Sequence, residues 1–588
     1  MKQRLVLVMG VILAAVSVVM IGFAGPATAA TSLEKQVKKA DKQKKQKCKK
    51  AKMVNRNKNA SGKAKSKAKK NCNKAKQKSR KLRKKMKKDN QQYFDVCKNG
   101  CKYKTVQSGA NAAGKWQLKN QSRTATVRVQ PGTYVEGVLL HGKQEGVDFD
   151  GLKIIGVKKN KDSNPNARAV ILEGTNAKTI VEGTPGWMPG DPTTIPANNA
   201  IEGRSIVGLV MKNMWAKNYQ NNTFFVWASN VKEDGELCAD FVMDNLVSSD
   251  TRAYGLFSRN CFGGKFLNSE GWNHGDSALY IGETPCDTYE WTNDGTPCQA
   301  EPKWTTVKNI TSHQNSLGYS GTNSKYVKIE DSTFYNNGAG IVPSTLDSEK
   351  FEPNGWLILE NNDIFWNNYN YYAPGSTVDT VIGNGNPTGV GIMLYGSDGV
   401  VSKNNNIFGN EQWGAATFSG PELFGVNDGD NAKNTNNQFI DNTMGRNGTD
   451  PNGNYDFFTD NSGGGNCWSG NTSSTFAPGN GSVPVSQIYP ACPKEKVLSS
   501  EVVSFDFSAG LQVNPAFLDP QEPWRDLTTI FGLAEVRPSE LQECSWNIAA
   551  SHPPYTDEDG VTYTEERANP VSAQECTDLA NRPSPWNP

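Results

Sequence analysis

Short runs of alternating apolar and polar residues fill the chain from about residue 103, and small groups of turn residues separate them. The stretch TATVRVQPGTYVEGVLL alternates on either side of Pro131-Gly132, which predicts a strand, a tight turn and a second strand. The stretches VDFDGLKIIGV and ARAVILEG continue the pattern. A period of two residues over such short runs predicts β-strands and not helices.

The strand pattern also repeats at longer range, because a short apolar run is followed by Asn or Asp at one recurring position. The interval is 23 residues from Asn245 to Asn268 and 22 residues from Asn309 to Asp331. The recurring residues are Asn213, Asn245, Asn268, Asn309, Asp331, Asn361, Asn404 and Asn442. A second apolar element follows about ten residues later, and its copies align through Gly255, Ala278, Gly318 and Gly340. The chain therefore contains repeating strand units of about 22 residues.

A 22-residue unit of short strands and polar turns predicts an all-β solenoid. Helical repeats would show a period of 3.6 residues, and a propeller blade needs about forty residues. In a parallel solenoid, each coil pairs its backbone with the next coil about 4.8 Å away and buries its inward side chains on its neighbours. Asn suits the turns, since it tolerates a left-handed backbone and bonds its neighbours in a ladder. An antiparallel sandwich with Asn-rich loops is the alternative.

Two stretches carry a resemblance to a known family. The opening VRVQPGTYVEGVLL and the coils NITSHQNSLGYSGTNSKYVKIEDSTFYNNGAGIVPS resemble right-handed parallel β-helix repeat proteins of the pectin lyase-like superfamily. The resemblance covers roughly residues 103–480 and implies the fold. The superfamily includes polysaccharide lyases, glycoside hydrolases, pectin esterases, uronan epimerases and non-catalytic surface proteins, so the fold does not decide the function.

The catalytic signatures of the superfamily's enzymes are missing from this sequence. The polygalacturonase-like set of Asn-Thr-Asp, Asp-Asp, Gly-His-Gly and Arg-x-Lys is absent as a set, and so are Asp-Pro-His and Trp-Ile-Asp-His. No catalytic residue can therefore be transferred from the resemblance, and a site has to be sought from the residues themselves.

The first residues of the chain predict export. Lys2 and Arg4 precede an apolar run from Leu5 to Phe23, and Ala-Thr-Ala at 27–29 offers a small-residue cleavage site. We interpret residues 1–30 as a signal peptide, with an uncleaved membrane anchor as the alternative. No second run of spanning length follows, so we expect a secreted, extracellular protein without a stable membrane span, associated with the cell wall in one reading.

Twelve cysteines suit an oxidising compartment, where thiols form disulfides. Their spacing suggests sequential pairs, although sequence alone does not fix connectivity. The suggested pairs are Cys48–Cys72, Cys97–Cys101, Cys238–Cys261, Cys286–Cys298, Cys467–Cys492 and Cys544–Cys576.

Charge divides the chain into a basic arm and an acidic body. Residues 31–90 hold 27 Lys or Arg and three acids, whereas residues 91–588 hold 35 basic and 56 acidic side chains. The arm, residues 31–102, is disordered or forms two Lys-rich helices that fold back at the turn 59–62 and are joined by Cys48–Cys72. Such an arm suits an anionic wall polymer, and export makes nucleic acid an unexpected partner. A solvated linker is the plain alternative.

The body is expected to be a monomer, with residues 103–480 as the β-helix and residues 481–588 as a cap on its open edge followed by an irregular tail. Its acidity disfavours a polyanionic substrate unless calcium or the arm holds it, so a neutral wall glycan is at least as suitable. Tryptophans such as Trp272 and Trp291 offer rings for sugar stacking.

Five residues form the candidate catalytic set, because coil stacking places them near one another. They are Asp250, Arg252, His274, Asp276 and Glu283. In lyase chemistry, Arg252 would neutralise a uronate and His274 would remove the adjacent proton. In hydrolysis, two of the three carboxylates would act as acid and as base or nucleophile. The plain alternative is that these residues only cap turns or face solvent.

No cofactor is indicated with certainty. Four histidines disfavour a multi-His metal site, and calcium remains open at the acidic turns 425–431 and 450–456, whose spacing matches no known calcium loop. We therefore expect a protein that binds, and in one reading cleaves, extracellular or cell-wall polysaccharide by lyase or hydrolase chemistry. The alternative is a non-catalytic surface scaffold or adhesin with a polyanion-binding arm.

Overall fold

The computed structural model describes residues 32–57, 59–89, 91–121, 123–142, 146–157, 167–182, 192–229, 237–285, 302–347, 349–369, 389–418, 433–453, 455–460, 463–472, 474–476, 485–493 and 554–564. They fall into two compact units, one ending at Gln91 and one beginning at Gln92. The expected signal peptide, most of the insertion 284–303, and the pairs Cys286–Cys298 and Cys544–Cys576 lie outside the described residues.

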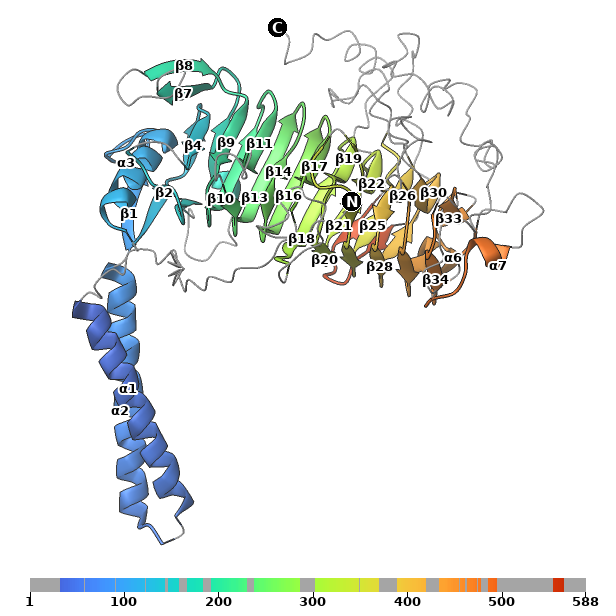
Figure 1. Cartoon of the computed structure of the whole chain (residues 1–588). Coiled ribbons are helices and arrows are strands. Elements are labelled where there is room, and N and C mark those ends of the chain that lie inside the picture. Colours follow the sequence, from blue (N-terminus) through green and yellow to red (C-terminus); the bar gives the residue numbers. More distant parts are fainter. Residues whose placement is uncertain are drawn as a thin grey trace, which may run out of the picture. The chain divides into compact units, whose positions relative to one another are not determined.

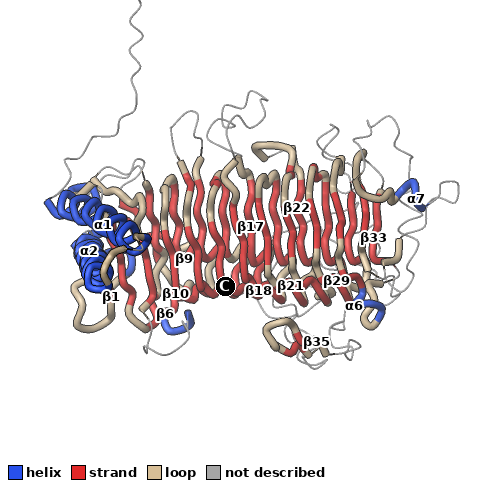
Figure 2. The backbone as a smooth tube through the Cα atoms, turned by 90° about the horizontal axis from the view of Figure 1, so that it is seen from below, coloured by secondary structure: helices blue, strands red, loops and turns tan. Residues whose placement is uncertain are grey.

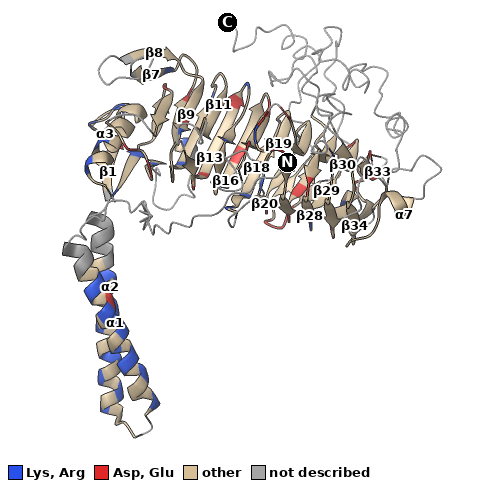
Figure 3. Cartoon of the chain, viewed as in Figure 1, with Lys and Arg blue, Asp and Glu red and all other residues tan. Residues whose placement is uncertain are grey.

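The first unit is a pair of Lys-rich helices, α1 (Ser32–Arg56) and α2 (Gly62–Asp89), joined by the disulfide Cys48–Cys72. A narrow apolar contact holds them together, and its buried members are Val37, Ala40, Cys72 and Ala75. Ser79 Oγ donates a hydrogen bond to Asp41 Oδ1 at 2.5 Å. Lysines occupy most of the remaining surface of both helices (Figure 3). The helical form of the arm is thus the one that occurs.

A helix that the sequence pattern did not predict opens the second unit. After β1 (Gln91–Val96), α3 (Val106–Lys119) begins at Thr105, whose side chain accepts a hydrogen bond from Ser108 N. The carboxylate of Glu136 accepts from Val106 N at 2.8 Å and from Gln107 N at 3.0 Å. The small residues of α3 are buried and belong to the solenoid core, so this helix closes the first coil.

Two long sheets build the solenoid, and their strands stack coil upon coil (Figures 1 and 2). Sheet 1 contains 18 of the described strands: β1, β2 (Thr124–Val129), β3 (Gly132–Tyr134), β5 (Lys153–Gly156), β6 (Val170–Glu173), β10 (Val210–Lys217), β13 (Val242–Thr251), β16 (Lys265–His274), β18 (Thr305–His313), β20 (Val327–Glu330), β21 (Thr333–Tyr335), β24 (Ile358–Glu360), β25 (Asp363–Phe365), β28 (Val401–Lys403), β29 (Asn406–Phe408), β31 (Gln438–Ile440), β32 (Thr443–Met444) and β34 (Cys467–Ser469).

Sheet 2 contains ten of the described strands: β4 (Val138–His141), β9 (Asn199–Arg204), β11 (Asn222–Trp227), β14 (Leu256–Arg259), β17 (Ser277–Gly282), β19 (Leu317–Thr322), β22 (Ala339–Ser344), β26 (Val390–Tyr395), β30 (Trp413–Phe418) and β33 (Tyr455–Thr459). Shorter described elements are η1 (Ala167–Ala169), β7 (Lys178–Glu182) with β8 (Pro192–Pro196), β12 (Cys238–Ala239) with β15 (Cys261–Phe262), β23 (Asn354–Gly355) with β27 (Ser397–Asp398), α6 (Gly445–Gly448), α7 (Val485–Ile488) and β35 (Tyr555–Thr556) with β36 (Thr562–Tyr563).

The strands of both long sheets pair in parallel with the equivalent strands of the next coil. In sheet 1, β13 pairs with β16 and β16 with β18 in parallel, and in sheet 2, β14 pairs with β17 and β17 with β19. The register places Gly318 opposite Gly340, as the repeat alignment predicted. The all-β, right-handed parallel β-helix is therefore confirmed, and the antiparallel sandwich is not the fold.

Left-handed turn residues explain the recurring Asn and Asp. Seven of the eight markers have φ between +49° and +59°, from Asn213 to Asn404. In the last coil the left-handed residue is Asp441, one position before the predicted Asn442. Asn442 instead points inward, where its Nδ2 donates to Asn471 Oδ1 at 2.9 Å. In that coil the sequence pattern therefore predicts the left-handed turn residue one position too late.

Buried asparagines form two ladders inside the turns. One runs through Asn362, Asn405, Asn442 and Asn471, and the other through Asn315, Asn337, Asn367, Asn410 and Asn452. Each side-chain amide donates to the next rung at 2.9–3.0 Å while its oxygen accepts a backbone N–H of the coil before it. The ladders satisfy buried backbone groups where the strands stop, which fixes the stacking of the coils.

The last coil is covered by α7 and the residues after it. Ile488 and Tyr489 are buried beside Phe457 and Trp468, and Trp468 N donates to Pro490 O at 2.9 Å. Four of the suggested disulfides form, namely Cys48–Cys72, Cys97–Cys101, Cys238–Cys261 and Cys467–Cys492. Among the described residues, no helix is long and apolar enough to cross a bilayer.

Candidate functional site

The outer face of sheet 2 carries a row of aromatic rings on consecutive coils. Phe225, Phe257 and Tyr280 occupy equivalent positions on β11, β14 and β17. The rings of Phe225 and Phe257 stack at 4.2 Å, and Phe257 meets Tyr280 edge-on at 4.9 Å. Tyr254, from the turn before β14, packs 4.6 Å from the Tyr280 ring. Alternation along these strands sends the aliphatic neighbours Leu256 and Leu279 into the core and the rings to the opposite face, where Phe257 is 7% and Tyr280 5% exposed.

Three carboxylates lie around the Tyr280 ring. Asp276 precedes β17, Glu283 follows it, and Glu349 comes from the segment after β22. The Tyr280 hydroxyl donates to Glu349 Oε2 at 3.1 Å, and Tyr254 hydrogen-bonds to Asp276. Glu349 interacts through charge with both Asp276 and Glu283. We call Asp276, Glu283 and Glu349 the carboxylate cluster.

Arg259 supplies the positive charge of this face. It occupies the position next to Gly282 in the neighbouring coil, and its Nη2 is 2.7 Å from Glu283 Oε1. The Arg259 side chain is 48% exposed, whereas that of Glu283 is 2% exposed. Glu283 Oε2 and Asp276 Oδ1 are buried and have no hydrogen-bond partner. Such carboxylate oxygens are costly to leave unpaired, so they are suited to meeting a ligand or a water.

Burial makes two members of the cluster weak acids. Burial, reinforced by the charge of Glu349, raises the pKa of Asp276 to about 7. Burial, reinforced by the charge of Glu283, raises the pKa of Glu349 to about 7 as well. Both carboxyls therefore retain protons near neutral pH, beside a third carboxylate that is paired with an arginine. Groups of this kind are typical of acid catalysis.

His274 lies inside the solenoid and does not reach this face, contrary to the expectation of a catalytic base. It is fully buried, with Nε2 at 2.9 Å from Ser248 Oγ and Nδ1 at 2.7 Å from Thr251 Oγ1. Burial lowers its pKa to about 3, so it is neutral at physiological pH. His274 N donates to Asn315 Oδ1, which places His274 at the head of an inner asparagine ladder. We therefore expect a structural role for His274.

Asp250 lies near the end of β13, and Arg252 lies in the segment between β13 and β14. Asp250 has φ +58°, as turn residues do, and its Oδ1 accepts from Asn273 Nδ2 at 3.1 Å. Arg252 is half-buried. The ion pair that the carboxylate cluster makes with Arg259 involves Glu283. Of the candidate set, the structure brings Asp276 and Glu283 to one face and places Asp250 and His274 elsewhere.

Glu349, Tyr254 and Tyr280 are the members of the site that sequence reasoning missed. Glu349 lies outside the repeating strands, so no periodic alignment could bring it to β17. Tyr254 and Tyr280 were visible in the recurring elements YGLFS and SALYI. Their adjacent positions before and within strands of neighbouring coils are the signal that could have indicated them.

The turns considered for calcium have other roles or lie outside the described residues. In the turn 450–456, Asp450 Oδ2 accepts from Trp366 Nε1 at 2.8 Å and Asp456 accepts from Thr475 N at 2.8 Å. Residues 425–431 are outside the described residues. Within the part of the chain that the structure describes, no group of three or more His, Cys, Asp or Glu side chains is placed to hold a metal ion.

Comparisons with known proteins concern the fold. No protein-family model and no curated protein matches the sequence. Among solved structures, the GH136 lacto-N-biosidase from Eubacterium ramulus is similar, at 9% identity over 70% of each chain with a TM-score of 0.35. A GH87 alpha-1,3-glucanase from Streptomyces thermodiastaticus is similar at 13% identity, over 64% of this chain and 67% of that one, with a TM-score of 0.33.

The Dettilon tailspike protein is similar at 10% identity, over 67% of this chain and 66% of that one, with a TM-score of 0.30. The chain is a parallel β-helix repeat protein. Its strands pair in parallel from coil to coil. This is the architecture that the resemblance to the pectin lyase-like superfamily implies. At TM-scores this low, no site residue can be transferred from these proteins to this chain.

Proposed function

We propose that the protein is a polysaccharide-active β-helix enzyme whose outer sheet 2 face hydrolyses glycosidic bonds. The observation that supports this proposal is the carboxylate cluster. Asp276 and Glu349, whose pKa values are raised by burial to about 7, lie beside the Arg259–Glu283 pair and a row of aromatic rings. Glycoside hydrolysis requires one carboxylic acid to protonate the leaving oxygen and one carboxylate to act as base or nucleophile. Aromatic rings supply the flat apolar surface on which sugar rings stack.

Each member of the cluster then has a role. Glu349 is the general acid, because its pKa is raised and its Oε2 is oriented by the Tyr280 hydroxyl. Glu283, held by Arg259, is the second carboxylate. Asp276 and Glu349 repel each other when both are ionised, and this repulsion helps to keep a proton on one of them. Hydrolysis is favoured over elimination, because His274 is buried and cannot serve as the lyase base.

The test is a screen of the purified full-length protein on a panel of neutral and acidic polysaccharides. Hydrolysis produces new reducing ends without ultraviolet absorbance, whereas elimination would add an absorbing double bond. Glu349→Gln and Glu283→Gln should each lower the rate at least about 100-fold, since each removes an acid–base group. Lys350→Ala, an exposed neighbour of Glu349, is the matched control and should retain full activity.

Two outcomes would contradict hydrolysis at this face. One is cleavage that survives Glu349→Gln and Glu283→Gln together. The other is an inert protein on every polysaccharide of the panel, which would leave the non-catalytic, surface-associated scaffold as the function.

We infer a second function for the arm, namely binding of an anionic polymer of the cell surface. The supporting observation is that α1 and α2 bury only a few small residues against each other and leave their lysines outside. Folding thus concentrates 26 of the 27 Lys and Arg residues of residues 31–90 on a compact helical pair. The paired cysteines support a location outside the cytosol, where disulfides persist.

A further inference from the structure

A second row of aromatic rings runs along the outer face of sheet 1, on different strands from the carboxylate cluster. Its members are in register on β16, β18, β21, β25 and β29. They are Trp272, His313, Tyr335, Phe365 and Phe408, with consecutive ring centroids 5.7, 5.1, 5.4 and 4.9 Å apart, all stacked. Trp215 of β10 extends the row, 6.0 Å from Trp272. We call these six residues the ring row.

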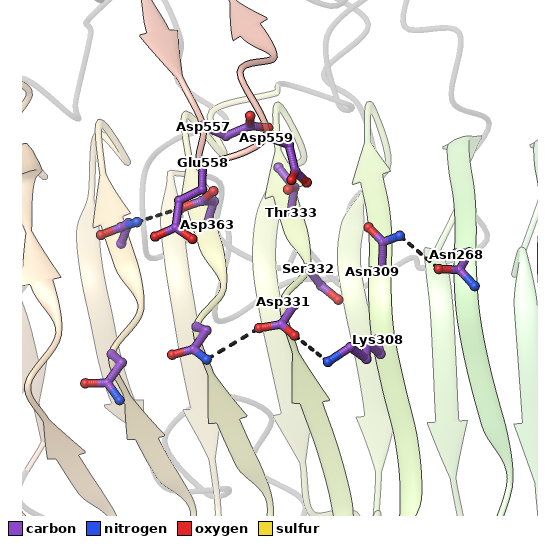
Figure 4. A pocket seen from close by; sticks show the side chains of 13 residues that line it. Asn268, Lys308, Asn309, Asp331, Ser332, Thr333, Asp363, Asp557, Glu558 and Asp559 are labelled. Carbon is purple, nitrogen blue, oxygen red and sulfur yellow. Dashed lines mark hydrogen bonds and ion pairs between the residues drawn. The ribbon is translucent and has the colours of Figure 1, made fainter. Parts of the chain in front are cut away.

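A polar row accompanies the ring row. The residue two positions before each ring is polar, and strand register aligns these residues as well. They are Glu270, Thr311, Thr333, Asp363 and Asn406. Between the polar row and the turn asparagines lies a groove of about 760 Å³, which extends from Asn268 to Asn404 (Figure 4). Rings and hydrogen-bonding groups thus lie in two parallel lines along the solenoid.

The chain itself covers one end of the ring row. Tyr555 and Tyr563 of the β35–β36 hairpin pack edge-on against Phe365 at 5.0 and 5.2 Å. Tyr563 also contacts Tyr335, and Tyr555 contacts Phe408. Asp557, Glu558 and Asp559, at the tip of the same hairpin, line the groove, and Glu558 lies beside Asp363 (Figure 4).

The other end of the ring row is not covered in this way by the described residues. Trp215, Trp272 and His313 are half-buried on the surface, and Arg168 lies 5.7 and 5.2 Å from the two indole rings. Arg168 Nη2 donates to Glu270 Oε2 at 3.0 Å, and Glu270 Oε1 is 3.4 Å from His313 Nε2. Flat rings are thus flanked by a guanidinium and a carboxylate, which are donors and acceptors for sugar hydroxyls.

We propose that the Trp215–Trp272–His313 end of the ring row, with the adjoining groove, is a non-catalytic binding site for a neutral polysaccharide chain. The faces of Trp272 and Trp215 are occupied by His313, Arg168 and Lys217, so a sugar chain would lie against the outward edges of the two indoles, while its hydroxyls would meet Arg168 and Glu270. Neutrality follows from charge, because five acids (Asp331, Asp363, Asp557, Glu558 and Asp559) line the groove against the single lysine Lys308. A polyanion would be repelled there. The proposal does not require hydrolysis at sheet 2.

The test is affinity electrophoresis of the full chain in native gels that contain xyloglucan, laminarin, hydroxyethyl cellulose or polygalacturonate. At least one neutral polysaccharide should slow the protein. Trp272→Ala should weaken that binding about tenfold, as expected for the loss of one large apolar contact. Arg168→Ala, a surface change with the side chain 51% exposed, should weaken the same binding and guards against misfolding of the Trp272 variant.

Matched controls separate this site from the others. Trp304→Ala removes a tryptophan that is 37% exposed and outside the ring row, and it should leave binding unchanged. Glu283→Gln should abolish cleavage without altering the retardation. The proposal is overturned if no gel with a neutral polysaccharide slows the protein, or if only polygalacturonate slows it. It is also overturned if Trp272→Ala and Arg168→Ala bind like wild type, or if Trp304→Ala weakens binding as much as Trp272→Ala does.

Discussion

At the scale of the residue, one step along the chain decides whether a polar side chain faces solvent or the interior. Asn273 has φ +55° and lies on the turn, whereas His274, the next residue, is fully buried. Asp441 and Asn442 show the same contrast. A repeat alignment from sequence is uncertain by about one residue, which is enough to confuse a turn position such as Asn273 with a buried position such as His274.

Replacement of His274 tests its structural role. His274→Ala should destabilise the protein by about 3 kcal/mol, because it opens a cavity and leaves Ser248 and Thr251 without their buried partner. Thermal or urea unfolding monitors this loss, with Lys265→Ala on the exposed side of β16 as the control. If His274→Ala abolished polysaccharide cleavage while stability stayed at the wild-type level, the histidine would be catalytic after all.

The raised pKa values of Asp276 and Glu349 predict how stability depends on pH. A carboxyl whose pKa is higher in the folded protein stabilises it fully below the unfolded pKa, and this contribution is lost as pH rises towards about 7. For Asp276 the loss is on the order of 3 kcal/mol. Unfolding free energies between pH 4.5 and 7.5 should therefore fall more steeply for wild type than for Asp276→Asn/Glu349→Gln. Equal slopes would disprove the raised pKa values.

At the scale of the element, different interactions stabilise each of the two units of the chain. The coils of the solenoid share buried asparagine ladders and a continuous apolar core. The arm has only a thin contact, in which Val37, Ala40 and Ala75 face each other amid dense positive charge. The disulfide Cys48–Cys72 is therefore expected to carry much of the arm's stability.

Removal of that disulfide should loosen the arm alone. In the full chain with Cys48→Ser and Cys72→Ser, backbone amides of α1 and α2 should exchange with deuterium about 10–100-fold faster at low salt. High salt should restore part of the protection, because it screens repulsion between lysines. Amides of β13 and β16 serve as the internal control. Undiminished protection of α1 and α2 at low salt would show that the helices need no crosslink.

At the scale of the whole molecule, the sequence contained the architecture but only part of the site. Coil spacing, turn asparagines and four cysteine pairs depend on local pattern, and the structure reproduces them. Glu349 and the Tyr555–Tyr563 hairpin reach their positions from outside the repeat. Side chains that arrive by such long-range contacts follow no period, so no alignment of coils could reveal them.

The arm's proposed role can be tested by deletion. A chain that lacks residues 32–89 should lose most of its binding to anionic cell-wall polymer in a pull-down, while neutral polysaccharide binding by the solenoid should persist. Binding of the full chain should fall steeply as NaCl increases from 50 to 500 mM, since charge attraction is screened. Equal retention of the shortened chain would contradict polyanion binding by the arm.

The central claim, that the sheet 2 carboxylate cluster cleaves glycosidic bonds, is tested most directly by a crystal structure of the Glu349→Gln variant with the oligosaccharide that wild type cleaves best. The account predicts a sugar on the Phe225–Tyr280 rings, with the scissile oxygen within hydrogen-bond reach of residue 349 and the anomeric carbon facing Glu283. An oligosaccharide bound at any other surface, with this face empty, would contradict it.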